Sequence, residues 1–278
     1  RLLNIGITAN TGYELTLNSV NIDKKNFTWS TAVTVSHNKQ MVIDAGGYDR
    51  IPTYIPNSYT YEMYGYKQGY PVNALWGMEY AGTWKSREEI EEAKITKKYV
   101  SKTSTFTDPG RAKYVDQNND GILDRNDIVY LGSSDPIIYG GIQNTFSVYG
   151  INISLYFNYS YGGYIFNPIE LSMGSGDNQT NQYRYMTNAW HPVRNPDSDI
   201  PRAGSKDFVV STAQRHDASF IRLKDVSVSY VFKMPQKPNK KIDSITLSLS
   251  GNNIYLWKYY NGFDPEVSSP NGTRRIDL

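Results

Sequence analysis

The chain has 278 residues, a formal net charge of +2, no cysteine and 24 tyrosines. Without cysteine it has no disulfide framework and no thiolate metal or catalytic site, and the small net charge, with no lysine- or arginine-rich run, gives no indication of nucleic-acid binding. The mean hydropathy is -0.56, and no apolar run reaches the ~18 residues that a transmembrane helix needs, so only strands are left as a way across a membrane.

Six segments in which apolar and polar residues alternate predict β-strands. In chain order they are 13–18, 27–36, 139–149, 151–161, 226–232 and 245–250. In 151–161 the odd positions, such as Ile153, Leu155 and Phe157, are apolar or aromatic, and nearly all even positions are small and polar. At ~3.3 Å per residue this segment reaches roughly 36 Å, and a tilt of about 40° makes it cover roughly 27 Å, the depth of the apolar band of an outer-membrane barrel.

Two of the six strands depart from the pattern. Asn144 interrupts the apolar positions of 139–149, and Arg222, Lys224 and Asp225 near the start of the fifth strand indicate a register slip, as at a β-bulge. A soluble sandwich is the alternative architecture, because its strands alternate as well. Its exposed face should carry about 25–35% charged residues, whereas Glu14 is the only charged side chain among the polar positions of the regular strand segments.

The connections between the strands favour a barrel in a membrane. Short connections at 21–26, Gly150 and 234–243 alternate with long ones at 40–138 and 162–218. Antiparallel barrels with tight turns on one side of a membrane and long loops on the other have this rhythm, whereas unstructured loops of ~100 residues are unusual in a compact soluble domain. We therefore predict an all-β, membrane-spanning antiparallel barrel with long extracellular loops.

Both long loops are rich in aromatic residues, whose flat rings could stack on sugar faces. The candidates for substrate contact are Tyr64, Tyr66, Trp76, Trp84, Tyr183, Tyr185 and Trp190. The competing explanation is that these rings pack the loops themselves or form a girdle at the membrane interface. The sequence alone does not separate the two. In the first loop, Ser86 and Glu89 form a capping box that predicts a short helix through Ile95.

An acidic segment in the first loop, DQNNDGILDRND at 116–127, has the spacing of an EF-hand-type calcium loop. Its oxygen ligands would be Asp116, Asn118, Asp120, the carbonyl of Ile122, Asp124 and Asp127. Asp127 stands where a bidentate glutamate is usual, and its shorter side chain resembles the dockerin variant. The alternative is a turn rich in Asp, Asn and Gly that needs no ion. A bound Ca2+ would stiffen the loop and take no part in catalysis.

The sequence does not indicate an enzyme. No GxSxG motif, glycine-rich phosphate loop or nucleotide fingerprint occurs, and nothing marks a pair of loop carboxylates as the acid and base of a glycosidase. Arg1 is neither a start methionine nor part of a signal peptide. Six strands also close a barrel poorly, so we expect a fragment whose edge strands pair with the rest of a larger barrel.

Several blocks in one order along the chain resemble the SusC/RagA family of TonB-dependent outer-membrane transporters. They are YVDQNNDGILDRND at 114–127 with 131–132 and 139–141, ASFIRLKDV at 218–226, and GNNIYLW at 251–257 leading into 262–267; 13–17 and 77–91 match further upstream. The resemblance implies a multi-pass barrel of about 22 strands in the outer membrane of a Gram-negative bacterium. Residues 1–278 would be the C-terminal portion of that barrel, without the plug domain, the TonB box and the last strand.

The resemblance also implies TonB-dependent import of an oligomeric nutrient, either a glycan or a peptide. The implied partners are a SusD-like surface lipoprotein, the TonB–ExbB–ExbD complex acting through the missing N-terminal part, the oligosaccharide or peptide substrate, and membrane lipid and LPS, but no nucleic acid. From the residues alone, a secreted, calcium-stabilised, β-rich carbohydrate-binding module or adhesin stays open as the alternative.

Overall fold

The computed structural model describes residues 6–52, 65–101, 108–174, 176, 181–205, 209–234 and 242–266. Six long antiparallel strands form one sheet, in the order β1-β2-β10-β11-β14-β15, so that neighbours in this sheet follow one another along the chain. The strands are β1 (Ile7–Lys24), β2 (Phe27–Asp44), β10 (Ile138–Val148), β11 (Ile151–Tyr161), β14 (Phe220–Lys233) and β15 (Ser244–Lys258). All six predicted strands are confirmed, and most of them are longer than the alternating segments.

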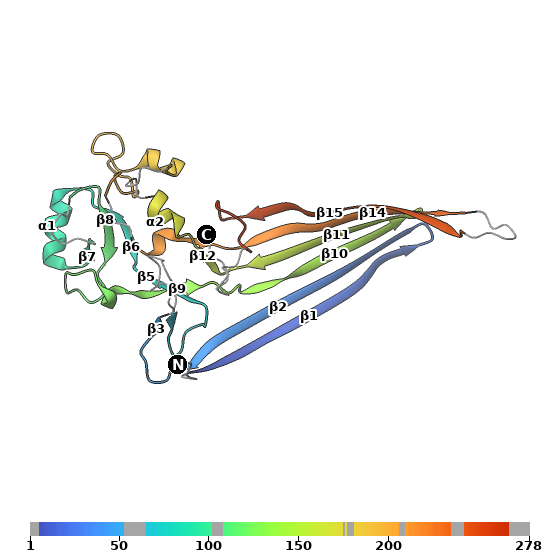
Figure 1. Ribbon diagram of the computed structural model, residues 1–278, viewed down its shortest axis with the longest axis horizontal. Helices are drawn as coiled ribbons and strands as arrows, with labels where there is room; N and C mark the ends of the chain where they lie inside the picture. The colour runs from blue at the N-terminus through green and yellow to red at the C-terminus, as the bar shows by residue number, and fades with distance from the viewer. Residues whose placement is uncertain are drawn as a thin grey trace.

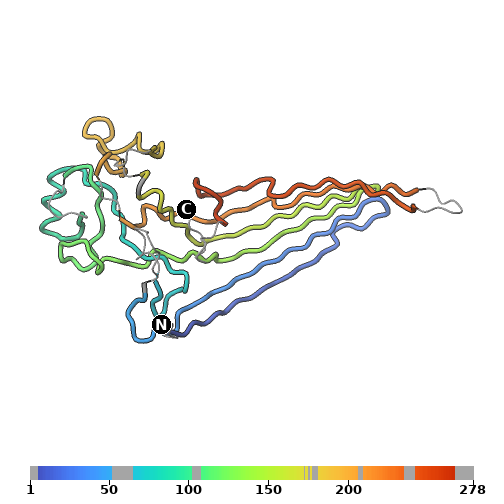
Figure 2. Tube along the Cα trace, in the orientation of Figure 1, coloured from blue at the N-terminus to red at the C-terminus, as the bar shows by residue number. Residues whose placement is uncertain are grey.

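The sheet projects from one side of a folded cluster of loops, which makes the molecule elongated (Figure 1). In the Cα trace the six strands run side by side, and the turns that join β1 to β2 and β10 to β11 lie at the end far from the loops (Figure 2). At that end the backbone N–H of Tyr149 donates to the carbonyl of Asn26 at 3.2 Å. Tyr149 and Gly150 have φ of 48° and 86°, the left-handed values that a two-residue hairpin turn requires. The predicted alternation of short turns and long loops is confirmed where the connections are described, and most of the third short connection, 234–243, lies outside the described residues.

The two faces of the sheet differ in chemistry, because side chains alternate between them. Across five paired strands, one row on the outer face is Trp29, Phe146, Ile153, Val228 and Leu249, and the adjacent row on the inner face is Ser30, Thr145, Ser154, Ser227 and Ser250. The outer face is largely bare, and Leu249 exposes 78% of its surface and Leu15 64%. In the described part of the chain, the clusters of buried hydrophobic residues lie among the loops and not on this face. A soluble sandwich would cover such a face with a second sheet.

The two departures from strict alternation have local explanations. The register of β14 shifts against both neighbours, between Leu223 and Asp225 and opposite Tyr156 and Phe157, so the predicted bulge is confirmed. Asn144 does lie on the outer face, where its Oδ1 accepts hydrogen bonds from Trp29 Nε1 at 3.0 Å and from Thr31 Oγ1 at 2.8 Å. Its polar oxygen is thereby paired within the sheet.

The long connections are folded and contain four small sheets, β3-β4, β5-β9, β6-β8-β7 and β12-β13. The first connection holds β3 (Ile51–Pro52), β4 (Gly65–Tyr66), β5 (Ala74–Gly77), β6 (Tyr80–Thr83), α1 (Arg87–Thr96), β7 (Tyr99–Val100), β8 (Ala112–Val115), the 3-10 helix η1 (Arg125–Asp127) and β9 (Val129–Ser133). The second holds β12 (Tyr164–Phe166), α2 (Ile169–Met173), the 3-10 helices η2 (Arg184–Asn188) and η3 (Thr212–Gln214), and β13 (Arg215–Asp217). Of these helices and strands, only α1 was predicted from the sequence.

The loop cluster has its own small cores. Leu75, Leu131 and Phe166 come from both connections and pack together, so the two long loops share a hydrophobic contact. Helix α1 begins as predicted, because the Ser86 side chain accepts a hydrogen bond from the Glu89 N–H. The Glu89 carboxylate, however, accepts from the backbone N–H of Lys85 rather than from that of Ser86. Among the described residues, no helix is both long and apolar enough to cross a membrane.

Candidate functional site

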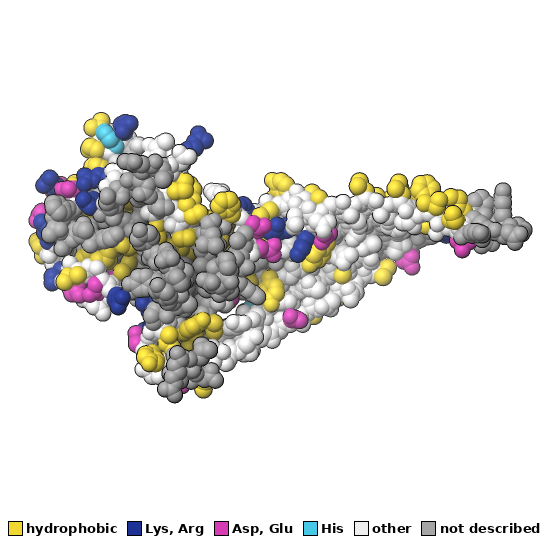
Figure 3. Space-filling view, viewed as in Figure 1, with side chains coloured by type: hydrophobic (Ala, Val, Ile, Leu, Met, Phe, Trp, Pro, Cys, Tyr) yellow, Lys and Arg dark blue, Asp and Glu magenta, His cyan; other side chains and the backbone are white. Residues whose placement is uncertain are grey.

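The inner face of the sheet carries small hydroxyl and amide side chains and almost no hydrophobic ones along its middle. In Figure 3 the visible part of the sheet is largely covered by uncharged side chains, and most of the charged ones gather at the loop cluster. A surface of this kind offers many hydrogen-bonding groups and few fixed charges. The charged and aromatic groups that do reach the inner face lie close to the loops.

A polar cavity of about 490 Å³ lies at the loop end of this face. Tyr139 of β10 and Tyr156 of β11 contribute rings, whereas Lys224 and Glu266 contribute charges of opposite sign. Tyr156 faces inward because it lies between the inner residues Ser154 and Asn158 of β11. Aromatic rings beside paired charges and amides are suited to binding a polar oligomer with both flat and hydrogen-bonding surfaces.

Arg222 fixes one wall of this cavity. Its side chain is only 8% exposed and binds both oxygens of Asp264, at 2.7 and 2.8 Å, and Glu266 Oε2 at 2.8 Å. The second Glu266 oxygen accepts a hydrogen bond from Asn158 Nδ2 at 3.0 Å. Burial alone would raise the pKa of Asp264, but the hydrogen bonds from Arg222 and the Glu266 N–H outweigh it and hold this pKa below its usual value. The segment after β15 is thus tied to the inner face of β14.

A second cavity, of about 410 Å³, lies within the loop cluster. Tyr183 and Tyr185 line it and stack on each other, with ring centres 5.4 Å apart and planes 10° apart. Glu170 and His216 also line this cavity, with Glu170 Oε2 2.9 Å from His216 Nε2. Burial, with smaller contributions from the charges of Glu170 and Tyr183, raises the pKa of Tyr185 well above its usual range. The Tyr185 hydroxyl is therefore a neutral hydrogen-bond donor near neutral pH.

The seven predicted aromatic contacts lie in different environments. Tyr183 and Tyr185 line the loop cavity, and Tyr66 is 39% exposed on the surface. Trp76 and Trp84 are only 4% and 1% exposed, so for these two the structure favours the alternative explanation, packing of the loop itself. Trp190 is half-buried, with its indole beside Gly110. Tyr64 lies outside the described residues.

The two buried tryptophans, Trp76 and Trp84, hold parts of the first connection together. The Trp76 Nε1–H donates to the carbonyl of Gly65 at 2.9 Å, and its ring lies edge-on against Tyr70. The Trp84 Nε1–H donates to Ser101 Oγ at 2.7 Å. Each indole therefore holds separate segments of the first connection together while its polar atom is satisfied.

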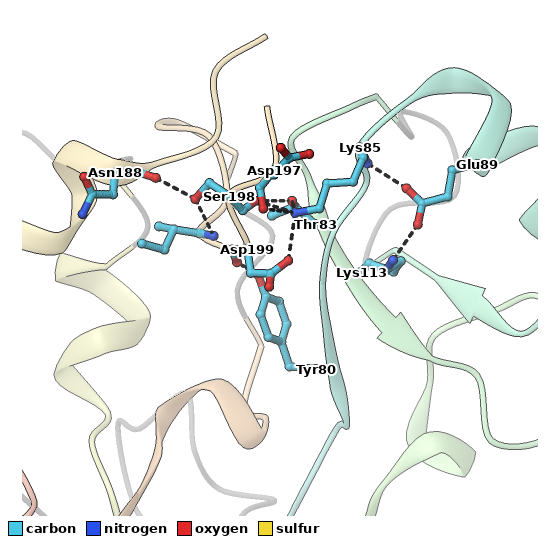
Figure 4. Close-up of polar contacts among 10 residues, drawn as sticks. Tyr80, Thr83, Lys85, Glu89, Lys113, Asn188, Asp197, Ser198 and Asp199 are labelled. Carbon is cyan, nitrogen blue, oxygen red and sulfur yellow. Dashed lines mark hydrogen bonds and ion pairs between the residues drawn. The ribbon is translucent and has the colours of Figure 1, made fainter. Parts of the chain in front are cut away.

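Lys85 joins the two connections, as Figure 4 shows. Its Nζ donates to the carbonyls of Asp197 and Ser198 at 2.9 and 2.7 Å and pairs with Asp199 Oδ1 at 2.8 Å. Nearby, the Glu89 carboxylate of α1 binds Lys113 Nζ of β8 at 2.6 Å (Figure 4). A cation surrounded by oxygens from the second connection acts as a clamp between the two loops.

The predicted calcium ligands lie in the loop between β8 and β9. Asp116 and Asp127 are buried, with 3% and 0% exposure, whereas Asn118, Asp120 and Asp124 are exposed. Among the described residues, no three His, Asp or Glu side chains come together in a geometry that could already hold a metal ion. Calcium binding stays a prediction at this point.

Sequence reasoning missed the groups that shape the inner cavity. Arg222 and Lys224 were noted only as charges that disturb a strand, and Asp264 and Glu266 were not singled out. A signal was present in Tyr156, a large ring on a face otherwise made of small side chains. The pairing of Arg222 with Asp264 joins residues 42 positions apart, so no local pattern could reveal it.

No family model matches the chain. TonB-dependent receptor P26 of Formosa agariphila is 33% identical over 273 residues, which cover 97% of this chain and 27% of the relative. TonB-dependent receptor P3 of the same organism is 29% identical over 276 residues, covering 98% of this chain and 26% of the relative. The chain therefore spans about a quarter of the length of these relatives.

Two solved structures have the same fold over nearly the whole chain. The RagAB peptide transporter superposes with a TM-score of 0.75 at 22% identity and covers 98% of this chain and 28% of that one. The RagAB peptide importer in its closed-closed state has a TM-score of 0.74 at 23% identity, with 98% and 29% covered. The long sheet and the folded loop cluster are thus an arrangement already seen in transport proteins.

Proposed function

Because this chain belongs to the TonB-dependent receptors, as part of their β-barrel, we propose that it forms part of an outer-membrane transporter that imports an oligomeric nutrient. The inner face of the six strands lines the lumen, and the outer face contacts lipid and LPS. The folded loops lie on the extracellular side. Energy comes from the TonB–ExbB–ExbD complex, which acts on a part of the transporter outside these strands.

The observation that carries this proposal is the contrast between the two rows of side chains. Val228 and Leu249 follow one another across β14 and β15 on the bare outer face, while Ser227 and Ser250 follow one another on the inner face. Burying apolar side chains in hydrocarbon is favourable by about 25 cal/mol per Å², whereas hydroxyl groups need water or a partner. Lipid on one side and a wet lumen on the other satisfy both rows.

The cargo we propose is a glycan or a peptide, bound first at the loop end of the lumen. The structural neighbours are a peptide transporter and a peptide importer, which supports a peptide. The ammonium of Lys224, which lines the cavity, would also suit the C-terminal carboxylate or an acidic side chain of a peptide. Tyr139, Tyr156 and the stacked pair Tyr183 and Tyr185 could serve sugar rings as well. A SusD-like lipoprotein over the loop cluster would deliver either cargo.

Cysteine labelling tests which face is wet, because the chain itself has no cysteine. In the full-length receptor, with any other cysteines replaced, Ser154→Cys and Ser227→Cys should react with a maleimide that does not cross membranes. The matched outer positions, Leu155→Cys and Val228→Cys, should stay unlabelled in isolated outer membranes and react only after the lipid is removed by denaturing detergent. Equal labelling of both sets in intact membranes would contradict the proposal.

A titration of the detergent-purified complex with peptides and with oligosaccharides then distinguishes the cargoes. Tyr156→Ala should weaken binding of the true cargo, since this ring lines the inner cavity. Tyr161→Ala is the control, because this tyrosine lies on the outer face and is 58% exposed. If both substitutions leave the affinity unchanged, the inner cavity is not the binding site.

A further inference from the structure

The loop at 116–127, between β8 and β9, is wound by hydrogen bonds from its own backbone to its acidic and amide side chains. The Gly121 N–H donates to Asp116 Oδ2 at 2.6 Å, the Asp120 N–H to Asn118 Oδ1 at 3.1 Å, and the Ile122 N–H to Asp120 Oδ1 at 2.8 Å. Gly121 has a φ of 88°, which a residue with a Cβ rarely adopts. Side-chain oxygens at the first, third and fifth positions of the loop are therefore each held by a backbone N–H group.

Asp116 provides an observation that is independent of this winding. The residue is 3% exposed, and its Oδ1 is buried without any hydrogen-bond partner. The other oxygen of the same carboxylate is fixed by Gly121, so Oδ1 is directed into the loop. A buried carboxylate oxygen that lacks a partner destabilises the fold unless a cation or a donor meets it.

Asp127 adds a second buried carboxylate to the same place. It is fully buried, and its two oxygens accept from the Gln117 N–H at 2.9 Å and the Asp124 N–H at 2.8 Å. Within the described part of the chain, no lysine or arginine forms an ion pair with Asp116 or Asp127. The nearby Lys97 Nζ donates to the carbonyl of Asp120 at 3.3 Å and not to a carboxylate, so the two buried carboxylates have no cationic partner there.

We propose that this loop binds one Ca2+, with Asp116 Oδ1 as the central ligand. Asn118, Asp120, Asp124, Asp127 and the carbonyl of Ile122 supply the remaining oxygens. All of these ligands are oxygens and the loop has neither histidine nor cysteine, which suits a hard cation and not zinc or copper. Calcium accepts six to eight oxygens in an irregular arrangement, as a loop of this length offers, whereas Mg2+ demands a near-ideal octahedron.

Binding requires only small movements of exposed groups. Asp120 Oδ2 accepts from Asn118 Nδ2 at 2.7 Å, and Asp124 Oδ2 accepts from Asn126 Nδ2 at 3.2 Å. Both contacts are exposed to solvent, so they cost little to exchange for an ion. Rotation of these two carboxylates towards Asp116 completes the ligand set. The buried pair, Asp116 and Asp127, does not have to move.

The ion would connect two of the small sheets. Strand β8 belongs to the sheet β6-β8-β7, and β9 pairs with β5. Between these two strands, the chain is held by backbone bonds to acidic side chains and by the 3-10 helix η1. A cation at Asp116 fixes the end of β8 to the start of η1 and so fixes the relative position of the two sheets.

Terbium luminescence tests the proposal in the full-length receptor purified in detergent and stripped of metal by a chelator. Tyr114, two residues before Asp116, is close enough to sensitise Tb3+ in the loop. We expect a luminescence signal that Ca2+ displaces with a Kd between about 10⁻⁵ and 10⁻³ M, and that Mg2+ displaces only at much higher concentration. Calcium should also raise the unfolding temperature, because it binds only the folded loop.

Three variants make the test specific. Asp116→Asn should weaken calcium binding by on the order of 100-fold, since the buried charge is lost. Asp120→Asn should weaken it too, and because Asp120 is exposed this variant leaves the fold intact. Asp49→Asn is the control, an exposed aspartate that pairs with Lys67. Absence of any calcium-displaceable signal, or equal affinity in Asp120→Asn and Asp49→Asn, would overturn the proposal.

Discussion

Arg222 holds Glu266 in place at the edge of the inner cavity. It lies where the register of β14 slips, so its guanidinium reaches inward to Asp264 and Glu266. One nitrogen of the guanidinium, Nη2, makes the contacts with both Asp264 oxygens and with Glu266 Oε2, and hydrogen bonds between ionised groups are stronger than those between neutral ones. Because the two acids come from the segment after β15, Arg222 helps to hold that segment against the inner face of the sheet, together with Asn158, which donates to Glu266.

The lowered pKa of Asp264 predicts how this contact responds to pH. A carboxylate with a lowered pKa in the folded state stabilises the fold above its ordinary pKa of about 3.9, and the effect is lost as the pH falls through the lower, folded-state value. The difference in unfolding temperature between wild type and Asp264→Asn should thus be constant near neutral pH and shrink below about pH 4. Thermal unfolding from pH 7 to pH 3 measures it.

Asp49→Asn is the matched control for this experiment, because Asp49 is exposed and pairs only with the partly exposed Lys67. Its effect on the unfolding temperature should be small at every pH. A difference between wild type and Asp264→Asn that grows on acidification would show that Asp264 is not held in its charged form by Arg222.

At the scale of the strand, alternation assigns each residue to lipid or to the lumen. A shift by one position exchanges the two environments, so adjacent residues on β14 should respond in opposite ways to the same substitution. Val228 pairs with Ile153 and Leu249 on the outer face, and Ser227 pairs with Ser154 and Ser250 on the inner face. The two residues lie at nearly the same depth.

Arginine at these two positions should therefore have unequal effects. Val228→Arg places a charge in hydrocarbon and should reduce the free energy of unfolding by about 2–4 kcal/mol, the cost of arginine near the middle of a bilayer. Ser227→Arg points into water and should cost far less. Urea titration of the receptor folded in lipid vesicles, followed by tryptophan fluorescence, gives both values. Equal losses would mean that β14 does not face lipid.

At the scale of the whole molecule, the two long connections behave as one folded unit on the end of the sheet. They share the core of Leu75, Leu131 and Phe166, and Lys85 adds a polar clamp from the first connection to the second. Such a unit can present the stacked tyrosines Tyr183 and Tyr185 in a fixed position. A loop cluster that is rigid in this sense needs less ordering when a ligand binds.

Removal of the clamp should loosen the second connection. In Lys85→Met the carbonyls of Asp197 and Ser198 lose their charged donor, so amide hydrogen exchange across 188–199 should become on the order of tenfold faster. Lys94→Met is the control, because Lys94 pairs only with Glu91 on its own helix. Exchange measured by mass spectrometry that is equally fast in both variants would exclude a clamp at Lys85.

The strands of the long sheet could be predicted from the sequence because the two faces of the sheet meet different solvents. Apolar and polar residues therefore alternate along β11 and its neighbours. The predicted length of β2 was too short, because this strand continues to Asp44. The alternation of apolar and polar residues weakens beyond the lipid-facing part. The small sheets of the loops were missed, because strands as short as Tyr99–Val100 carry no period. For Trp76 and Trp84 the residue type fitted both a binding surface and a core, and only tertiary packing decides between them.

The contacts of Asn144 have a consequence for how the barrel is assembled. The Asn144 Oδ1 is hydrogen-bonded on the outer face only while Trp29 and Thr31 of β2 lie beside it, as they do in the native alignment. Any other alignment of β10 on β2 would leave an amide without partners in lipid, at a cost of several kcal/mol. Asn144 therefore favours the native alignment of β10 on β2 over shifted alignments when these two strands pair in the membrane.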